Sequence, residues 1–274
     1  MKGLYGLIGE KLGHSFSPQI HSLIFEELKV DGYYHLFEID KNDVSGIIPG
    51  FKTFKVKGAN VTIPYKVDII KYLDNISEEA KNIGAVNTIC FKNGKTEGYN
   101  TDYFGFGMML NKFNIDVKDK SVVILGTGGA SKAVRQYILD NGAKEITFVT
   151  RDVSDKKDDL KEFKVISYDD IKNLQDQDVV INCTPCGMYP KISKSPLTKE
   201  EVSKFKAVVD LIYNPKETLI MKYAKEQGIK AINGLYMLVG QAVKAEELWN
   251  DIKIQDRIID SIYERISKLI RSEE

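Results

Sequence analysis

Hydrophobic residues in the first third of the chain follow two spacings, one typical of strands and one typical of helices. The apolar run from Leu4 to Gly9 is short and bounded by glycines, which predicts a buried strand. Residues 17–30 carry apolar side chains at three- and four-residue steps, which predicts a helix with Ser17 as its N-cap and Pro18 in its first turn. Further strands are predicted at residues 33–39, 58–63 and 85–91.

A second series of strands and helices begins near Asp102. Residues 101–113 have the pattern of a connecting helix, and β-branched runs that predict buried strands follow at residues 121–126, 145–150, 178–184 and 207–213. A helix is predicted at residues 129–139, and strands that alternate with helices favour a parallel sheet with right-handed crossovers. From Gly234 onward the pattern is helical, with many charges on one face. The chain is therefore predicted to be an α/β protein.

The composition excludes several classes of protein. Hydrophobic residues make up 43% of the 274 residues, which is typical of a globular rather than a disordered protein. The 39 basic and 39 acidic residues give no net charge and form no block of one sign, so neither nucleic acid nor a membrane is an expected partner. No apolar run has the roughly 18 residues of a membrane-spanning helix. The first residues lack a signal-peptide core, so a cytoplasmic location is expected.

A glycine-rich turn joins the strand at residues 121–126 to the helix at residues 129–139. Gly126, Gly128 and Gly129 let the backbone approach a pyrophosphate, and the helix N-terminus adds free N–H donors. An ordinary tight turn explains the same glycines, but its position between strand and helix favours a dinucleotide site.

The end of the next strand indicates which dinucleotide is bound. NAD-binding sites usually have an acidic residue there that binds the ribose 2′-hydroxyl, whereas this chain has neutral Thr150 followed by Arg151. An arginine suits a 2′-phosphate, which favours NADP, and Lys156 offers a second positive charge. Asp152 opposes this assignment, and a solvated charged loop is the alternative interpretation.

The segment GANVTIPYK holds candidate catalytic chemistry. Asn60 and Thr62 alternate with apolar neighbours and share one face of the predicted strand. Lys66 stands at the expected start of a helix, where the helix dipole and desolvation would lower its pKa and suit it to proton transfer. Taken alone, a solvated surface lysine is the simpler interpretation.

Three further polar clusters have simple structural explanations when taken singly. Ser15 and Ser17 follow the first predicted strand, Asn87 lies in GAVNT, and Asp102 lies in GYNTD. A helix cap, a turn or the end of a strand explains each of them.

The two cysteines of CTPCGM, Cys183 and Cys186, have the spacing of a thioredoxin-like redox site or half of a zinc site. A redox pair of this kind opens a helix, whereas Pro185 and Gly187 indicate a loop. A zinc site needs about two further ligands, and this half of the chain has no other cysteine or histidine. We therefore expect neither a metal site nor thiol chemistry.

Together these motifs resemble those of the shikimate dehydrogenase family, whose members reduce 3-dehydroshikimate with NADPH in aromatic biosynthesis. The resemblance runs nearly from end to end, through GHSFSPQIH, GANVTIPYK, GAVNTI, GYNTD, LGTGGAS, NCTPCGM, DLIYNP and NGLYMLVGQA. It implies a substrate-binding α/β domain of residues 1–102 and 236–274, to which the C-terminal helices return. It also implies a Rossmann-type NADP-binding domain of residues 103–235, with the active site between the two.

The resemblance assigns roles to individual residues. Lys66 and Asp102 would be the catalytic pair, with Lys66 giving a proton to the carbonyl oxygen. The substrate would be bound by Ser15, Ser17, Asn60, Thr62, Lys66, Asn87, Asp102 and Gln241, with Tyr213 nearby. The cofactor would be lined by Gly126, Thr127, Gly128, Gly129, Ala130, Thr150, Arg151, Leu211 and Gly234, with Glu78 and Lys156 as further candidates.

Departures from the family pattern leave alternatives open. The adenine side of the family reads Asn-Arg-Thr followed by another basic residue, whereas this chain has Thr150-Arg151-Asp152 and Asp155 before Lys156, so NAD remains an alternative cofactor. The cysteines of CTPCGM fall on variable positions of the family's loop.

Two other functions are alternatives to the shikimate dehydrogenase interpretation. A relative that also oxidises quinate would differ in only a few pocket contacts, and Ser17 favours shikimate. A non-catalytic nucleotide-sensing protein on this scaffold would have little reason to keep both Lys66 and Asp102. A small-molecule substrate is the expected partner, and the chain is expected to be a monomer or a homodimer.

Overall fold

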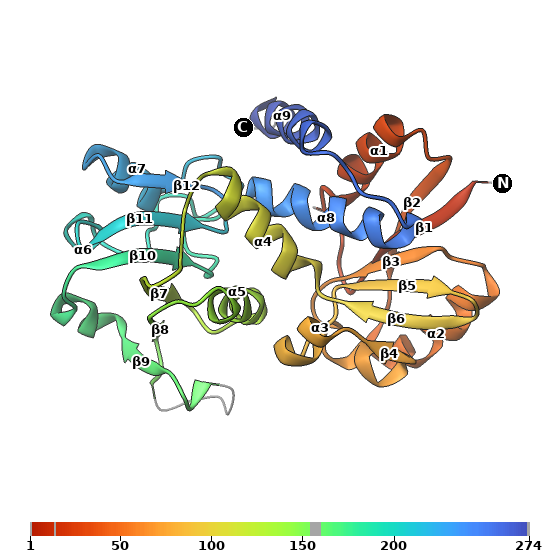
Figure 1. Ribbon diagram of the computed structural model, residues 1–274, viewed down its shortest axis with the longest axis horizontal. Coiled ribbons are helices and arrows are strands. Elements are labelled where there is room, and N and C mark those ends of the chain that lie inside the picture. The colour runs from red at the N-terminus through yellow and green to blue at the C-terminus, as the bar shows by residue number, and fades with distance from the viewer. Residues whose placement is uncertain (1, 14, 154–159, 273–274) are drawn as a thin grey trace. The chain divides into compact units, whose positions relative to one another are not determined.

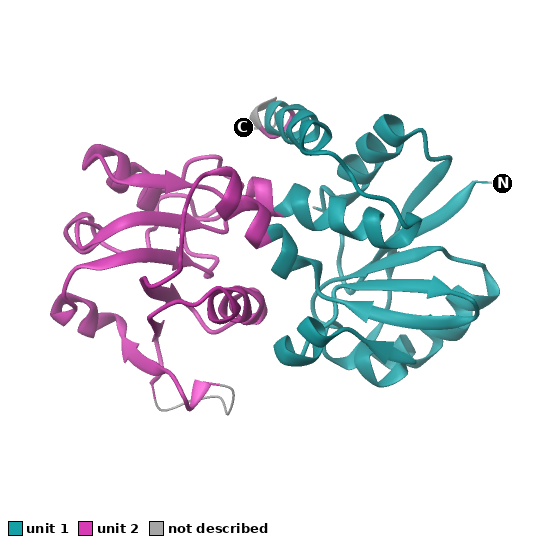
Figure 2. Cartoon of the chain, in the orientation of Figure 1, with its two compact units in different colours: residues 1–105, 238–268 teal, residues 106–237, 269–274 magenta. Residues whose placement is uncertain are grey.

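A computed structural model of the protein describes residues 2–13, 15–153 and 160–272 (Figure 1). The chain divides into two compact units, residues 1–105 with 238–268 and residues 106–237 with 269–274 (Figure 2). Each unit has its own six-stranded sheet, which confirms the predicted two-domain α/β fold. No helix in the described part of the chain is long and apolar enough to cross a membrane.

The first unit is built on a mixed sheet with the strand order β2-β1-β3-β5-β6-β4. Its strands are β1 (Gly3–Gly9), β2 (Gly32–Glu38), β3 (Gly58–Val61), β4 (Asn75–Ile76), β5 (Thr88–Lys92) and β6 (Lys95–Tyr99). β1 is parallel to β2 and β3, whereas β5 is antiparallel to β3 and β6. Because the carboxyl end of β3 meets the amino end of β5, Asn60 lies opposite Thr88.

Helices pack on this sheet around two hydrophobic clusters. They are α1 (Ser17–Leu28), α2 (Val44–Thr53), α3 (Glu78–Ile83) and the 3₁₀ helices η1 (Lys41–Asp43) and η2 (Asp68–Tyr72). One cluster joins Phe51 of α2 to Val61 of β3. The other joins Phe25 of α1 to Tyr5 of β1. The sheet is thus buried by apolar contacts that the 3.6-residue and two-residue spacings of the sequence supply.

The C-terminal helices return to the first unit, as predicted. They are α8 (Leu235–Asn250) and α9 (Asp256–Ser272). Trp249 of α8 lies so close to β3 that a β-carbon at Gly58 would stand 2.3 Å from its ring. Arg265 of α9 forms an ion pair of 3.0 Å with Glu26 of α1.

Four expectations for the first unit are wrong in detail. The strand predicted at residues 85–91 begins only at Thr88. α1 has Phe16 rather than Ser17 as its N-cap. The strand that was expected to reach Ile63 ends at Val61. Lys66 lies in a turn ahead of η2 rather than at the start of a helix. The local pattern located each segment but not its last residue, because contacts with the rest of the fold decide where an element ends.

The second unit has an all-parallel sheet with the strand order β12-β11-β10-β7-β8-β9. Its strands are β7 (Ser121–Leu125), β8 (Glu145–Thr150), β9 (Lys164–Ser167), β10 (Gln177–Asn182), β11 (Phe205–Asp210) and β12 (Lys230–Ile232). Its helices include α5 (Gly129–Asp140), α6 (Lys199–Val202) and α7 (Leu219–Glu226). The order is that of a Rossmann fold, in which ligands bind beyond the carboxyl ends of the strands where the order reverses, here between β7 and β10.

Candidate active site

Lys66 and Asp102 form an ion pair in the first unit. The Lys66 Nζ lies 2.7 Å from Oδ2 of Asp102, and the two side chains keep 25% and 18% of their surface exposed. Asp102 lies in the first turn of α4 (Thr101–Lys112), where a helix N-terminus stabilises a carboxylate. The backbone N–H of Val86 donates to the Lys66 carbonyl oxygen at 2.8 Å. The pair is therefore held in place and remains open to solvent.

The surroundings of Lys66 differ from those expected. It lies in a turn, and its Nζ donates a hydrogen bond to the Asp102 carboxylate. An ammonium next to a carboxylate can give a proton to an oxygen that becomes negative and can take it back in the reverse reaction. The pair can therefore act as a general acid and base.

Asn87 lies just before β5, and among the described residues only the oxygen of its side-chain amide is hydrogen bonded. Its Oδ1 accepts a hydrogen bond of 2.7 Å from the backbone N–H of Thr101 and bonds of 3.1 Å from the hydroxyls of Thr88 and Thr101. Its Nδ2 makes no hydrogen bond to any described residue. Asn87 therefore offers hydrogen-bond donors and no free acceptor.

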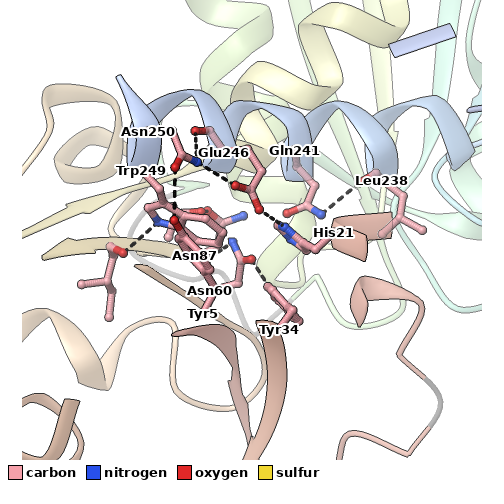
Figure 3. A network of polar contacts seen from close by, with 12 residues as sticks. Tyr5, His21, Tyr34, Asn60, Asn87, Leu238, Gln241, Glu246, Trp249 and Asn250 are labelled. Atoms are coloured by element: carbon pink, nitrogen blue, oxygen red, sulfur yellow. Dashed lines mark hydrogen bonds and ion pairs between the residues drawn. The ribbon is translucent and has the colours of Figure 1, made fainter. Parts of the chain in front are cut away.

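The Asn60 side chain makes all its hydrogen bonds to other residues of the protein. Its Nδ2 donates to the Asn87 carbonyl oxygen at 3.3 Å and to the Thr88 hydroxyl at 3.0 Å, and its Oδ1 accepts from the Tyr34 hydroxyl at 2.7 Å (Figure 3). Its side chain is only 5% exposed. Both amide hydrogens are used, so Asn60 connects β2, β3 and β5. Thr62, which was predicted to share one strand face with Asn60, follows β3 and is partly exposed.

Ser15, Ser17 and Gln241 belong to the same unit and are all partly exposed. The Ser15 hydroxyl accepts a hydrogen bond of 3.2 Å from the backbone N–H of Ser17. Burial raises the pKa of Tyr34 well above its usual value, and a hydrogen bond with the Ser17 side chain opposes this rise. On α8, Gln241 donates from Nε2 to the Leu238 carbonyl oxygen at 3.0 Å (Figure 3).

His21 and Glu246 form a buried pair that the sequence patterns did not predict. The His21 Nδ1 lies 2.6 Å from the Glu246 carboxylate, and neither side chain is exposed. The His21 ring stacks on Tyr34 with 4.0 Å between the ring centroids (Figure 3). One sequence signal could have found His21, because it lies four residues after Ser17 and therefore on the same face of α1.

In the second unit the glycine-rich turn lies at the point where the strand order reverses. Gly126 has a φ of +92°, and a β-carbon there would stand 2.8 Å from the Thr184 side chain, so β7 and the loop after β10 meet at this glycine. Thr127 follows, and Gly128, Gly129 and Ala130 are exposed at the N-terminus of α5. The turn therefore leaves backbone N–H groups open to an anion.

The candidates for the adenine side are only partly described. Thr150 ends β8, and Arg151 and Asp152 follow as exposed neighbours. Lys156 and Asp155 lie outside the described residues. Glu78 lies in the first unit, exposed and ion-paired with Lys81 at 2.6 Å.

Leu211 and Gly234 are brought together by β11 and β12. The Gly234 N–H donates to the Ile212 carbonyl oxygen at 3.1 Å, and a β-carbon at Gly234 would stand 2.0 Å from the Leu211 carbonyl oxygen. Only a glycine allows this approach of the two backbones. Tyr213 follows, and burial raises its pKa.

The loop after β10 is organised by a buried carboxyl group and not by its cysteines. Asp210 accepts hydrogen bonds from Asn182 (2.9 Å), the Ile212 N–H (3.1 Å) and the Thr218 hydroxyl (2.5 Å). Burial raises the pKa of both Cys183 and Cys186, which disfavours the reactive thiolate. In the described part of the chain no three His, Cys, Asp or Glu residues form a group that could hold a metal ion.

Family models match both halves of the chain. Residues 7–89 match the shikimate dehydrogenase substrate binding domain, and residues 108–217 match shikimate / quinate 5-dehydrogenase. A shikimate dehydrogenase (NADP(+)) of Clostridium perfringens is 47% identical over 96% of this chain and 98% of its own length.

Solved structures agree with this match. A chorismate mutase/shikimate 5-dehydrogenase fusion protein from Clostridium acetobutylicum has a TM-score of 0.95 and 55% identity, over 99% of both chains. A shikimate dehydrogenase in complex with NADP+ has a TM-score of 0.85 and 36% identity, over 96% of this chain and 94% of its own.

Proposed function

The chain belongs to the shikimate dehydrogenase family, and we propose that it is an oxidoreductase that interconverts 3-dehydroshikimate and shikimate with NADP. The observation that carries this function is the ion pair of 2.7 Å between Lys66 and Asp102. A protein that only sensed a nucleotide would need no such pair. The partner of the protein is a small molecule.

The second unit fits a dinucleotide phosphate. Its glycine-rich turn leaves the N-terminus of α5 exposed at the reversal point of the sheet, where a pyrophosphate gains N–H donors and a favourable dipole. Arg151 is exposed at the end of β8, where its planar guanidinium suits a 2′-phosphate. Leu211 and Gly234 would line the cofactor from the ends of β11 and β12.

The residues of the first unit would bind the substrate and exchange one proton. When bound, NADPH supplies the hydride to the carbonyl carbon. Lys66 gives a proton from Nζ to the carbonyl oxygen, so that a hydroxyl forms, and Asp102 holds the ammonium and binds a neighbouring hydroxyl. In the reverse direction Lys66 takes the hydroxyl proton. A donor already in place at a developing negative oxygen typically lowers the barrier by about 3 kcal/mol.

Ser15, Ser17, Thr62, Asn87 and Gln241 would bind the carboxylate and the remaining hydroxyls. Asn87 supports this role best, because its Oδ1 is fixed and its amide hydrogens are available. The substrate side of the site therefore presents mainly donors, which suits a hydroxylated carboxylate.

A dual quinate and shikimate dehydrogenase that uses NAD or NADP is the second candidate. The observation in its favour is Asp152, which is exposed beside Arg151 and opposes a 2′-phosphate by its charge. Steady-state turnover of shikimate and quinate, each with NADP and with NAD, separates the two candidates. We expect the highest kcat/KM for shikimate with NADP. Turnover in none of the four combinations would rule out the proposed function.

A further inference from the structure

The Asn87 amide is held in one orientation from within the protein. A rotation of the amide by 180° would place the Nδ2 hydrogens against the backbone N–H of Thr101, which now donates to Oδ1 at 2.7 Å. Two donors would then face each other, and a buried N–H group would lose its acceptor, which is unfavourable. The orientation that leaves Nδ2 outward is therefore strongly favoured.

Thr88 strengthens this orientation. Its hydroxyl accepts a hydrogen bond of 3.0 Å from Asn60, so its own proton is available to the Asn87 Oδ1 at 3.1 Å or to the Thr101 hydroxyl at 3.0 Å. The Thr101 hydroxyl in turn donates to the same Oδ1. Either arrangement directs hydroxyl protons at Oδ1.

Asn60 is itself oriented by its neighbours. Its Nδ2 faces the Asn87 carbonyl oxygen, which can only accept, and its Oδ1 faces the Tyr34 hydroxyl. The Tyr34 ring is stacked on His21, which Glu246 holds (Figure 3). A continuous set of contacts thus leads from α8 to the amide of Asn87.

Thr88 is fully buried, whereas Asn87 keeps a small exposed surface of 3%. Thr88 and Thr101 have no exposed surface. In the described part of the chain the buried polar atoms without a partner are His21 Nε2 and Asn100 Oδ1, so the unpaired Asn87 Nδ2 must reach solvent. A ligand in contact with this cluster would therefore meet Asn87 and not Thr88.

From this arrangement we infer that Thr88 and Asn60 are positioning residues, which fix Asn87 so that the substrate atom it meets must be a hydrogen-bond acceptor. The inference rests on the proposed function and extends it to specificity. It also changes the role of Asn60 from a substrate ligand to a support for one. A hydroxyl or carboxylate oxygen satisfies Asn87, whereas a methylene group or an ammonium leaves its donors unpaired.

The substitution Thr88→Val tests the inference, because valine keeps the shape of threonine and removes the hydroxyl. We expect the KM for shikimate to rise roughly 3- to 10-fold, the worth of one hydrogen bond, with little change in kcat or in the KM for NADP. Thr88→Ser restores the hydroxyl and should restore the KM. Tyr34→Phe keeps the stacked ring and loses the bonds to both Asn60 and Ser17, so it should raise the KM at least as much.

Thr96→Val is the matched control. Thr96 is as buried as Thr88, lies in the same sheet, and hydrogen bonds to Asp74 away from Asn87. We expect it to lower the melting temperature and to leave the KM for shikimate unchanged.

A double-mutant cycle with Asn87→Ala shows whether Thr88 acts through Asn87. In the Asn87→Ala background, Thr88→Val should change the KM by less than about twofold. An unchanged KM in Thr88→Val, or a KM effect that persists without Asn87, would overturn the inference while the wild-type protein still turned over shikimate. A wild-type protein without turnover would overturn the proposed function and this inference with it.

Discussion

The Lys66 ammonium and the Asp102 carboxylate lie 2.7 Å apart although 36 positions separate them in sequence. The turn after β3 carries one and the first turn of α4 carries the other. The proposed acid and the carboxylate that holds it are thus supplied by two separate segments of one unit, an arrangement that suits proton transfer.

Lys66→Ala removes the proposed proton donor. We expect kcat for shikimate oxidation to fall by about 10²–10⁴-fold, with a much smaller change in KM, because the lost interaction acts mainly in the transition state. Steady-state kinetics with saturating NADP measure it. Lys71→Ala, at an exposed lysine of η2, is the control and should behave as wild type. A near-native kcat in Lys66→Ala would exclude the catalytic role.

Asp102→Ala should also lower kcat more than it raises KM. It leaves Lys66 without the carboxylate that holds Nζ, so the ammonium is no longer directed at one point. The double variant Lys66→Ala/Asp102→Ala should be little worse than Lys66→Ala, because residues that act as a unit are not additive. Fully additive losses would show that the two side chains act independently.

Arg151→Ala should weaken NADP and spare NAD. The loss of a charge-assisted bond to a 2′-phosphate is expected to raise the KM for NADP about 10- to 100-fold. Asp152→Asn should lower the KM for NADP by removing a like charge, and Arg257→Ala, at an exposed arginine of α9, is the control. Equal effects of Arg151→Ala on NADP and NAD would remove Arg151 from the 2′-phosphate site.

The sequence predicts four strands of the second sheet and the glycine-rich turn, because these depend on local patterns, whereas the short strands β9 and β12 were not predicted. β7 and β8 coincide closely with their apolar runs, and the Gly126 turn follows β7 as the glycines indicate. In the first unit the proposed roles of Lys66 and Asp102 are implied by the family resemblance, since nothing in either segment alone shows that they meet.

The sequence could place His21 on the same face of α1 as Ser17, but it could not predict the pairing of His21 with Glu246. His21 and Glu246 are 225 positions apart, and Glu246 lies among other charged residues of α8, where an exposed helix face has the same pattern. In the sequence pattern, nothing distinguishes Thr88 from any other strand residue. The expectation that Ser17 caps α1 failed for a related reason, since Phe16 takes that place and the Ser17 side chain is engaged by Tyr34.

The double substitution Cys183→Ala/Cys186→Ser should leave activity largely intact. Burial raises the pKa of both thiols, so neither is prepared for redox chemistry at neutral pH. Turnover of shikimate measures the result, and a circular dichroism spectrum confirms the fold. A large loss of activity with the fold preserved would reopen the thiol hypothesis.

The buried Asp210 should make stability depend on pH. Burial raises its pKa from 3.8 to about 6, so between these values the folded state keeps a proton that the unfolded state has released. The free energy of unfolding should therefore fall as pH rises from about 4 to about 6, by on the order of 3 kcal/mol, and this contribution should stay constant above that range.

Asp210→Asn isolates this contribution, because the amide does not titrate. Urea unfolding of the wild type and of the variant, at several values of pH across this range, should show the fall in the wild type only. The comparison uses the slope with pH, so it holds even where the variant has a lower stability throughout. Asp169→Asn, at an exposed aspartate of the same unit, should keep the wild-type slope. The same fall in Asp210→Asn would assign it to other groups.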